Sequence, residues 1–415
     1  MAQKTKGPAS YEASDITVLE GLEPVRVRPG MYIGSTGPSG LHHLIRELVD
    51  NAVDEAMAGV CTRIDVTVLA DGSCRVSDDG RGIPVEEHPQ YPGQSAAEIV
   101  YTTLHAGGKF GGGGYKVSGG LHGVGASIVN ALSTKLLLEI DRNDQHYQMS
   151  FKDGGRPQGK LKVTGPAPRG RTGTSVTFTP DPTIFDDVDF RAQTITERLQ
   201  IMAFLNRGLE IRFVDERVGR QSKETYKYNG GIVDYVRHLN NAKESLFRKV
   251  GFYEQTEPGQ EVEVAFQWNT GYYESIHSFA NGIATIEGGM HEEGFRKAIT
   301  NVVNRYARKR NLLKEKDENL AGEDIREGLT AIVSVRLAEP QFEGQTKGKL
   351  GNVAIRSLVE RATNEKLADW LEENPKEGGQ IVAKSLQAAR ARQAARHARD
   401  LTRRKSCLLY TSRCV

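Results

Sequence analysis

The sequence predicts a two-domain α+β protein: a layered sandwich of helices on one face of a largely antiparallel sheet, followed by a second α/β unit. A chain of 415 residues is too long for a single hydrophobic core. In the N-terminal half, one long amphipathic helix pattern precedes several short alternating strand patterns, which is typical of an α+β sandwich. A polar stretch, "QSKETYKYNGG" at 221–231, then separates this half from a second set of strands and helices.

The elements of the first domain are predicted from hydrophobic periodicity and turn residues. Apolar residues recur at helical spacing in "LHHLIRELVDNAVDEAMAG", which predicts a helix over 41–59 ended by Gly59. Alternating residues on either side of an Asp71-Gly72 turn predict a hairpin over 62–80. The same reasoning predicts strands at 135–141, 146–151, 160–165 and 172–180 and helices at 125–133 and 190–206.

The second domain is predicted in the same way and ends in a basic helix. Its expected elements are strands at 261–268, 273–283 and 329–337 and helices at 291–310 and 378–405. Within the last helix, residues 384–405 carry eight Lys or Arg residues and one acid, Asp400. A solvated helix face and a surface that faces phosphates both agree with this charge distribution.

Composition narrows the class of protein. Hydrophobic residues make up 38% of the chain and charged residues 26%, which is ordinary for a soluble globular protein. No apolar run reaches the ~20 residues that a membrane span requires, and "MAQKTKGPAS" lacks the apolar core of a signal peptide, so we expect a cytoplasmic protein without membrane contact. The four cysteines form no CxxC pair, which argues against zinc and disulfides. The net charge of +2 neither favours nor excludes nucleic acid.

The first predicted helix carries a stripe of polar side chains within a wide apolar face. The stripe recurs at a spacing of one helical turn and consists of His43, Glu47, Asn51 and Glu55. Glu47 is suited to act as a general base, because the imidazole of His43 can orient it. Asn51 offers a neutral oxygen that suits Mg²⁺. An exposed helix with polar contacts between neighbours would show the same pattern.

Two glycine-containing motifs follow this helix. In "SDDGRGIP" (77–84), Asp78 stands at a predicted strand end, where its carboxylate can accept a hydrogen bond from an exocyclic amine such as adenine N6. "GGLHGVG" (119–125) lies directly before the next predicted helix, where backbone N–H groups form an anion site for phosphates. Each motif alone is also a common turn composition.

The glycine content around the second motif needs a reason, because glycine loses more backbone entropy on folding than any other residue. Ten of the twenty-one residues in 107–127 are glycine. The segment is either a linker without a task or a backbone that approaches a ligand closely. A P-loop is excluded because GxxxxGK[ST] does not occur. A dinucleotide fold is excluded because the glycines at 120–125 follow a predicted loop, without a βαβ frame.

The order of these motifs resembles the GHKL ATPase superfamily. The segments "ELVDNAVDEA", "DDGRGIP", "LHAGGKF", "YKVSGGLHGVG" and "QTKGKL" are similar to those of the gyrase B family, the ATPase subunits of type II DNA topoisomerases. The resemblance covers about residues 11–406. It implies a GHKL-type ATPase sandwich followed by a transducer domain with a fold that recurs in ribosomal proteins. The glycine-rich segment then corresponds to a lid over ATP, which must open for nucleotide exchange.

The resemblance also implies the roles of individual residues. Glu47 activates the attacking water and is oriented by His43, Asn51 holds Mg²⁺, and Asp78 and Thr174 recognise the adenine. Gln345 and Lys347 reach the γ-phosphate from the second domain, where the lysine neutralises developing charge. Tyr11 and Ile16 contact the ATP of a second copy of the chain. The other residues implied to bind ATP are Gly80, Gly82, Ile83, Pro84, Lys109, Tyr115, Gly119, Gly120, Leu121, His122, Gly123, Val124 and Gly125.

The implied organisation and partners follow the same resemblance. The expected segments are an arm at 1–16, an ATP-binding domain at 17–224, a transducer domain at 225–395, a basic helix end at 396–406 and a tail at 407–415. The implied partners are a second copy upon ATP binding, DNA gyrase A in a heterotetramer, and double-stranded DNA captured for negative supercoiling. Two alternatives remain open: the ATPase component of topoisomerase IV, and a nucleotide-gated dimerisation module with little turnover of its own.

The sequence also departs from the family pattern. The family continues into a metal-binding cleavage domain with an "EGDSA"-type motif, which does not occur here, so we expect an N-terminal fragment that does not cut DNA. The tail "CLLYTSRCV" matches nothing in the family at that place.

Overall fold

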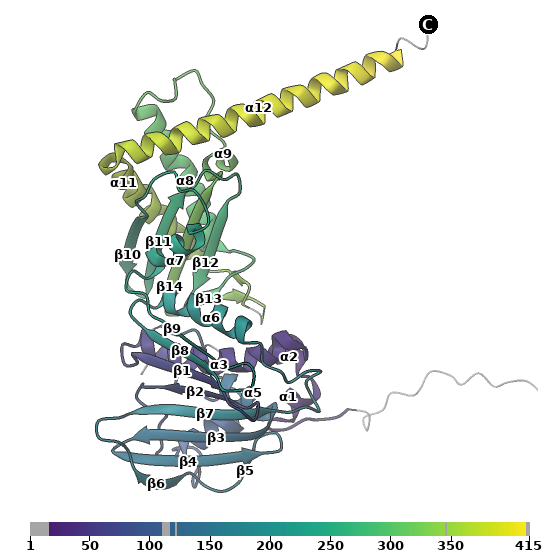
Figure 1. Cartoon of the computed structure of the whole chain (residues 1–415), viewed down its shortest axis with the longest axis vertical. Helices are drawn as coiled ribbons and strands as arrows, with labels where there is room; N and C mark the ends of the chain where they lie inside the picture. Colours follow the sequence, from purple (N-terminus) through teal and green to yellow (C-terminus); the bar gives the residue numbers. More distant parts are fainter. Residues whose placement is uncertain (1–15, 110–116, 121–122, 345–346, 412–415) are drawn as a thin grey trace, which may run out of the picture.

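The computed structural model describes residues 16–109, 117–120, 123–344 and 347–411, with the backbone alone over 404–411. Two α/β regions lie one above the other along the long axis, and the C-terminal helix projects from the second (Figure 1). The first region contains a nine-stranded sheet and the second a five-stranded sheet.

The sheet of the first region has the order β5-β4-β3-β7-β2-β1-β8-β9, with β6 paired to β4. Neighbouring strands are antiparallel except β1 and β8, which run parallel. The strands are β1 (Arg63–Val68), β2 (Cys74–Asp78), β3 (Ser133–Arg142), β4 (Gln145–Lys152), β5 (Arg156–Pro157), β6 (Lys162–Pro166), β7 (Gly173–Pro180), β8 (Glu210–Asp215) and β9 (Ser222–Tyr226).

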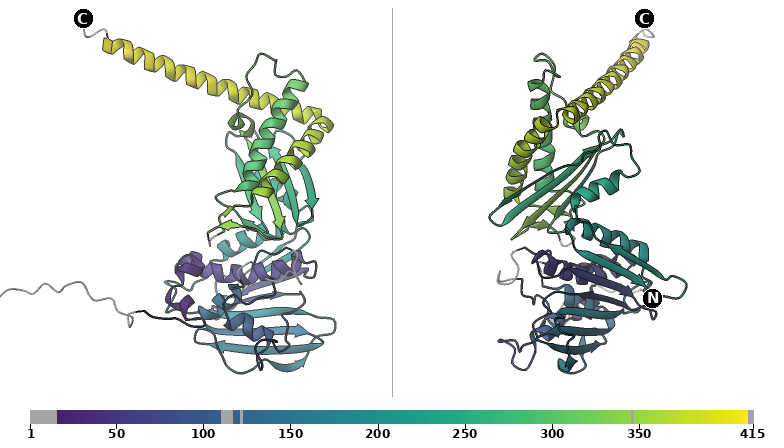
Figure 2. Two further views of the ribbon diagram at one scale, coloured as in Figure 1. Left: turned by 180° about the vertical axis from the view of Figure 1, so that it is seen from behind. Right: turned by 60° about the vertical axis from the view of Figure 1, so that its left-hand side comes forward.

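Helices cover one face of this sheet, as the sequence predicts (Figure 2). They are α1 (Glu23–Val27), α2 (Gly30–Ile33), α3 (Pro38–Met57), α4 (Ala96–Thr102), α5 (Gly125–Ala131) and α6 (Ala192–Leu205). Alternate residues of β1, namely Ile64, Val66 and Val68, are fully buried in the same core as Leu44 and Leu48 of α3. The apolar face of α3 therefore packs on the buried face of the sheet.

The second region is a sheet with helices on both faces. Its strand order is β10-β11-β14-β12-β13, in which β12 and β14 are parallel. The strands are β10 (Gly251–Glu257), β11 (Gln260–Trp268), β12 (Ser275–Ala280), β13 (Ile283–Ala284) and β14 (Leu329–Leu337), and β15 (Phe342–Glu343) pairs separately with β16 (Lys349–Leu350). The helices are α7 (Ile232–Asn240), α8 (Met290–Lys309), α9 (Gly322–Arg326), α10 (Val353–Ala362), the π-helix η2 (Thr363–Leu367), α11 (Ala368–Glu373) and α12 (Pro375–Thr411).

The two sides of this sheet bury different clusters. Val264 of β11 packs with Phe295 of α8, whereas the adjacent Ala265 packs with Val236 of α7. Because successive strand residues point to opposite faces, α7 and α8 cover opposite sides.

Most predicted elements are present, and the differences have local causes. Residues 273–283 form two strands instead of one, because Asn281 (φ +50°) and Gly282 (φ +76°) make a turn between them. The polar residues 222–226 form the edge strand β9, which spans the expected domain boundary at 224–225. Elements that were not predicted include the helices α4 and α7 and the strands β8 and β10.

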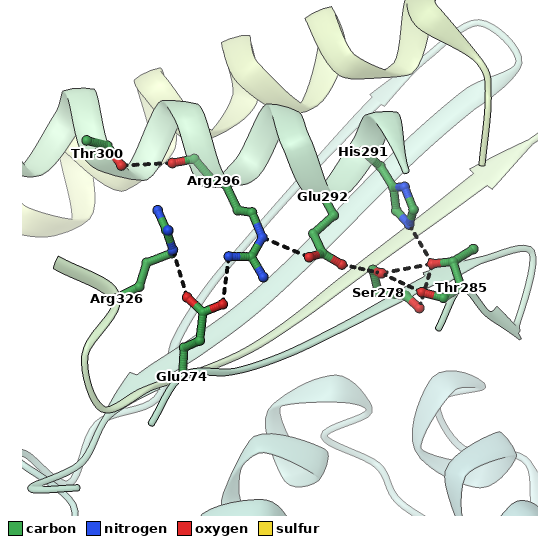
Figure 3. A network of polar contacts seen from close by, with 8 residues as sticks. All are labelled: Glu274, Ser278, Thr285, His291, Glu292, Arg296, Thr300 and Arg326. Atoms are coloured by element: carbon green, nitrogen blue, oxygen red, sulfur yellow. Dashed lines mark hydrogen bonds and ion pairs between the residues drawn. The ribbon is translucent and has the colours of Figure 1, made fainter. Parts of the chain in front are cut away.

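A network of polar side chains lies between β12, β13, α8 and α9 (Figure 3). Glu292 accepts a hydrogen bond from Ser278 at 2.7 Å and one from Arg296 at 2.8 Å. His291 is fully buried, with its Nε2 3.1 Å from the Thr285 hydroxyl oxygen and its Nδ1 without a hydrogen-bond partner among the described residues. Burial lowers the pKa of His291 to about 4.

We expect this buried histidine to make stability depend on pH. Because the folded pKa is about 4 and that of an unfolded histidine is ~6.5, the unfolded chain binds more protons between these values. The free energy of unfolding is therefore unaffected by this group above about pH 6.5. It falls as the pH drops towards 4, by on the order of 3 kcal/mol. The free energy of unfolding, measured with urea between pH 4.5 and 8, should depend less steeply on pH for His291→Gln than for the wild type. His397→Gln, which changes an exposed residue of α12, is the control. An unchanged slope for His291→Gln would contradict the assignment.

Candidate nucleotide site

The polar stripe of α3 begins with a pair of contacting side chains. His43 Nε2 lies 3.0 Å from Glu47 Oε1, and each side chain keeps about a fifth of its surface exposed (22% and 21%). Burial acts to raise the pKa of Glu47, but the His43 hydrogen bond and the positive charges of Lys347 and Arg46 outweigh it, so the net shift is downward. Glu47 is therefore a carboxylate at neutral pH, in contact with the imidazole of His43 one helical turn earlier.

The start of α5 meets this pair directly. A Cβ at Gly125, the first residue of α5, would lie 2.2 Å from Glu47 Oε2. A side chain at this position would displace the Glu47 carboxylate, so glycine here leaves Glu47 in its present orientation. The end of the glycine-rich segment and the candidate base thus form one surface.

Further along α3, Asn51 and Asp54 contact Lys109 and two residues of the segment 118–120, which we call the base of the glycine-rich segment. Lys109 Nζ donates to Asn51 Oδ1 at 2.9 Å and forms an ion pair with the buried carboxylate of Asp54. The amides of Gly119 and Gly120 donate to Asp54 at 2.7 Å and 3.2 Å. In this conformation these two amides bind a carboxylate of the protein.

The adenine candidates Asp78 and Thr174 stand side by side, because β2 and β7 pair with Ser77 opposite Ser175. Burial raises the pKa of Asp78 to about 7, although its Oδ1 accepts a hydrogen bond from the Gly80 amide at 2.8 Å. Thr174 Oγ1 accepts from the Ile83 amide at 3.2 Å. A buried carboxylate whose charge is only partly compensated is a strong acceptor for an amine donor.

The loop after Asp78 is fixed by residues that the sequence did not assign to the site. Glu55 binds Arg81 through both carboxylate oxygens, at 2.7 Å and 3.0 Å. Arg142 donates to the Gly82 carbonyl at 2.8 Å. Gly82 has φ +75°, a conformation that favours glycine. The helical spacing that places Glu55 in the polar stripe of α3 was a usable signal for this contact, whereas Arg81 and Arg142 had none.

The second region contributes Lys347, which lies between β15 and β16. Its Nζ donates to the Gly119 carbonyl at 3.0 Å, so the two regions meet at the glycine-rich segment. The structure therefore brings together Glu47, Asn51, Gly119 and Lys347. Ile16 begins the described chain and is 60% exposed. Five predicted site residues lie outside the described residues: Tyr11, Tyr115, Leu121, His122 and Gln345.

Solved structures are similar to this chain over most of its length. The 43K ATPase domain of Thermus thermophilus gyrase B in complex with an aminocoumarin superposes with a TM-score of 0.78 at 43% identity, over 92% of this chain and 98% of that one. The topoisomerase IV ATP-binding domain of Francisella tularensis gives a TM-score of 0.74 at 33% identity, over 90% of this chain and 98% of that one.

The curated sequence relatives of this chain are longer than the chain itself. It is 54% identical to DNA gyrase B of Micrococcus luteus and 53% identical to that of Mycolicibacterium smegmatis. These alignments cover 97% and 98% of this chain but 61% and 64% of the relatives. The chain therefore spans less than two thirds of the length of the curated relatives it matches.

Two family models match complementary parts of the chain. The model of histidine kinase-, DNA gyrase B- and HSP90-like ATPases matches residues 36–184, which contain the α3 stripe, Asp78 and Thr174. Fold and site thus define an ATPase domain of the GHKL class. The DNA gyrase B model matches residues 231–401. With the relatives above, this places the chain in the DNA gyrase B family.

Membrane spans and metal clusters are two features that the described residues lack. Among these residues, no helix combines the length and the apolar character that crossing a membrane requires. The same part of the chain contains no group of three or more His, Cys, Asp or Glu side chains that could hold a metal ion.

Proposed function

We propose that this chain binds and hydrolyses ATP as the N-terminal ATPase part of a gyrase-type DNA topoisomerase. The observation that carries the proposal is the environment of the ionised Glu47. Its carboxylate lies 3.0 Å from His43 and directly beside Gly125, and the positive charge of Lys347 helps to lower its pKa. A base in this environment can accept a proton from a water molecule, and a lysine from the second region can offset charge on a phosphate.

Adenine recognition is assigned to Asp78 and Thr174. The carboxylate of Asp78 would accept a hydrogen bond from the exocyclic amine of adenine, and Thr174 beside it would complete the recognition, in the family through water. Gly80, Gly82, Ile83 and Pro84 would form the wall against which the base lies. The contact of Glu55 with Arg81 keeps this wall in place.

In the hydrolytic step, a water oxygen attacks the γ-phosphorus, and the bond from that phosphorus to the bridging oxygen of ADP breaks. Glu47 accepts the proton that the attacking water loses, while His43 holds the carboxylate in position. Lys347 would neutralise charge on the γ-phosphate, and the neutral amide of Gln345 would donate a hydrogen bond to it. The amides of Gly123, Val124 and Gly125, with those of Leu121 and His122, would bind phosphate oxygens together with Lys109 and Tyr115.

Asn51 fits a role as a ligand of Mg²⁺. Its carbonyl oxygen already accepts a hydrogen bond from the ammonium group of Lys109 at 2.9 Å, so the position attracts a cation. An amide oxygen is a ligand of the hard type that Mg²⁺ prefers, and the remaining ligands would be phosphate oxygens and water. When bound, the ion would neutralise phosphate charge.

In the whole protein, we propose that ATP closes a homodimer that captures double-stranded DNA, in a heterotetramer with DNA gyrase A that introduces negative supercoils. The basic helix α12 supplies exposed arginines for DNA phosphates. The ATPase component of topoisomerase IV is the alternative, supported by the Francisella tularensis neighbour. The higher identity to gyrase B sequences favours the first assignment.

We expect phosphate release to rise faster than linearly with protein concentration, because each arm is proposed to cap the site of the other protomer. Deleting residues 1–16, which include Tyr11 and Ile16, should abolish this behaviour and the dimer formed with a non-hydrolysable ATP analogue. Nucleotide binding to the monomer should remain. Analytical ultracentrifugation with the analogue and steady-state phosphate release check both expectations. Absence of turnover at every concentration would favour a nucleotide-gated dimerisation module instead.

A further inference from the structure

The base of the glycine-rich segment is held from the second region by two side chains. Asn281, at the turn between β12 and β13, donates through Nδ2 to the Ser118 carbonyl at 2.7 Å. Lys347 donates to the next carbonyl, that of Gly119, at 3.0 Å. Adjacent carbonyl groups of the first region thus bind neighbouring donors of the second.

The carboxamide of Asn281 is also bound to the end of β14. Nδ2 donates to the Leu337 carbonyl at 2.9 Å, and Oδ1 accepts from the Leu337 amide at 2.7 Å. The Asn281 amide donates to the Val335 carbonyl at 2.9 Å. Asn281 is only 2% exposed, so each of these bonds replaces a bond to water that burial removes.

The position of Asn281 matters because β14 leads to Lys347. Leu337 is the last residue of β14, and the chain continues from it to the loop that carries the lysine. Asn281 therefore ties the start of this loop to the same segment that the lysine contacts. We propose that Asn281 is a positioning residue that holds Lys347 in place against the glycine-rich segment. This proposal rests on the proposed ATP hydrolysis.

A purely local role for Asn281 can be separated from this one. Asn281 has φ +50°, and asparagine, aspartate and glycine all tolerate this conformation. Asn281→Asp keeps the turn and the acceptor for Leu337 but removes both donors. Asn281→Gly keeps the turn and removes the whole carboxamide. Asn311, which follows α8 at φ +55°, provides the matched control Asn311→Asp.

We expect both Asn281 variants to lower kcat for phosphate release about tenfold, the effect of one or two lost hydrogen bonds. ADP affinity by calorimetry should stay within about twofold, because the adenine site is untouched. Asn311→Asp should match the wild type in both measurements. Thermal melting of each protein identifies a variant that has not folded, in which case the other Asn281 variant decides.

A double-mutant cycle with Lys347→Ala tests the positioning role itself. If Asn281 acts through Lys347, then Asn281→Gly should cost little further activity once Lys347 is alanine. Independent losses that multiply would overturn the proposal, as would wild-type kcat in both folded Asn281 variants. A wild-type protein without phosphate release would instead contradict the proposed function, so the two failures are distinguishable.

Discussion

Replacing Glu47 by alanine is expected to lower kcat for ATP hydrolysis by about 10²–10⁴-fold, the usual effect of removing a general base. The Glu47 carboxylate is ionised and lies 3.0 Å from His43. The amides of Gly119 and Gly120 donate to Asp54 and not to Glu47. The variant should therefore still bind ATP. Because dimer closure is proposed to need the γ-phosphate and not its hydrolysis, the dimer should form and persist.

Asn51→Ala should behave differently, because Asn51 is assigned to Mg²⁺. Losing this ligand should weaken both nucleotide binding and closure, and it also removes the acceptor of Lys109. The two variants are compared by phosphate release and by dimer lifetime with ATP and Mg²⁺. Glu197→Ala, an exposed helical position on α6, is the control for a glutamate lost from a helix. Near wild-type hydrolysis by Glu47→Ala, or loss of its dimer while Asn51→Ala dimerises normally, would refute the assigned roles.

The parts of the site that depend on local spacing could be predicted from the sequence. The stripe of His43, Glu47 and Asn51 follows from one turn of helix per step, and α3 presents it as expected. The proximity of Asp78 and Thr174 depends on strand pairing across almost a hundred residues of chain, which the motifs indicate only through family resemblance. The contact of Asn281 with Ser118 joins two regions and has no local signal.

The fold was predicted best where burial is regular. β14 begins and ends as predicted, because nearly all its residues are buried and apolar or small. β9 was missed because an edge strand with mostly exposed residues shows no alternation. Asp54 was missed for the opposite reason: a sequence does not show that a carboxylate is buried, since burial depends on the amides of Gly119 and Gly120 that satisfy it.

Replacing Asp78 by asparagine is expected to weaken ATP binding by about 1.5–3 kcal/mol, the range for a hydrogen bond to a charged group. The side-chain oxygen of asparagine can still accept from the Gly80 amide, so the loop should keep its conformation. The substitution removes the ionised oxygen that we propose as the acceptor for the adenine amine. Calorimetry at pH 8, where the wild-type carboxylate is ionised, measures this loss. Unchanged affinity would remove Asp78 from the site.

The same substitution should stabilise the protein in the absence of nucleotide. The folded pKa of Asp78 is about 7, whereas that of an unfolded aspartate is ~3.9. The folded state therefore binds the proton more tightly, and stability falls as the pH rises from about 4 to 7, by on the order of 4 kcal/mol. Asparagine does not titrate, so Asp78→Asn should be more stable than the wild type at pH 8, and the advantage should vanish near pH 4.

The adjacent Asp79 supplies a control of opposite sign. Burial acts to raise the pKa of Asp79, but hydrogen bonds from the Thr62 hydroxyl and the Thr62 and Arg63 amides outweigh this and lower it. Asp79→Asn should therefore destabilise the protein at pH 8 and leave ATP affinity nearly unchanged. Urea unfolding at pH 8 measures both variants. If Asp78→Asn is also less stable than the wild type, the ionised Asp78 carboxylate of the wild type does not destabilise the folded protein. Burial would then not hold the pKa of Asp78 above its usual range, and a raised pKa could not support the proposed role of Asp78 as the acceptor for adenine.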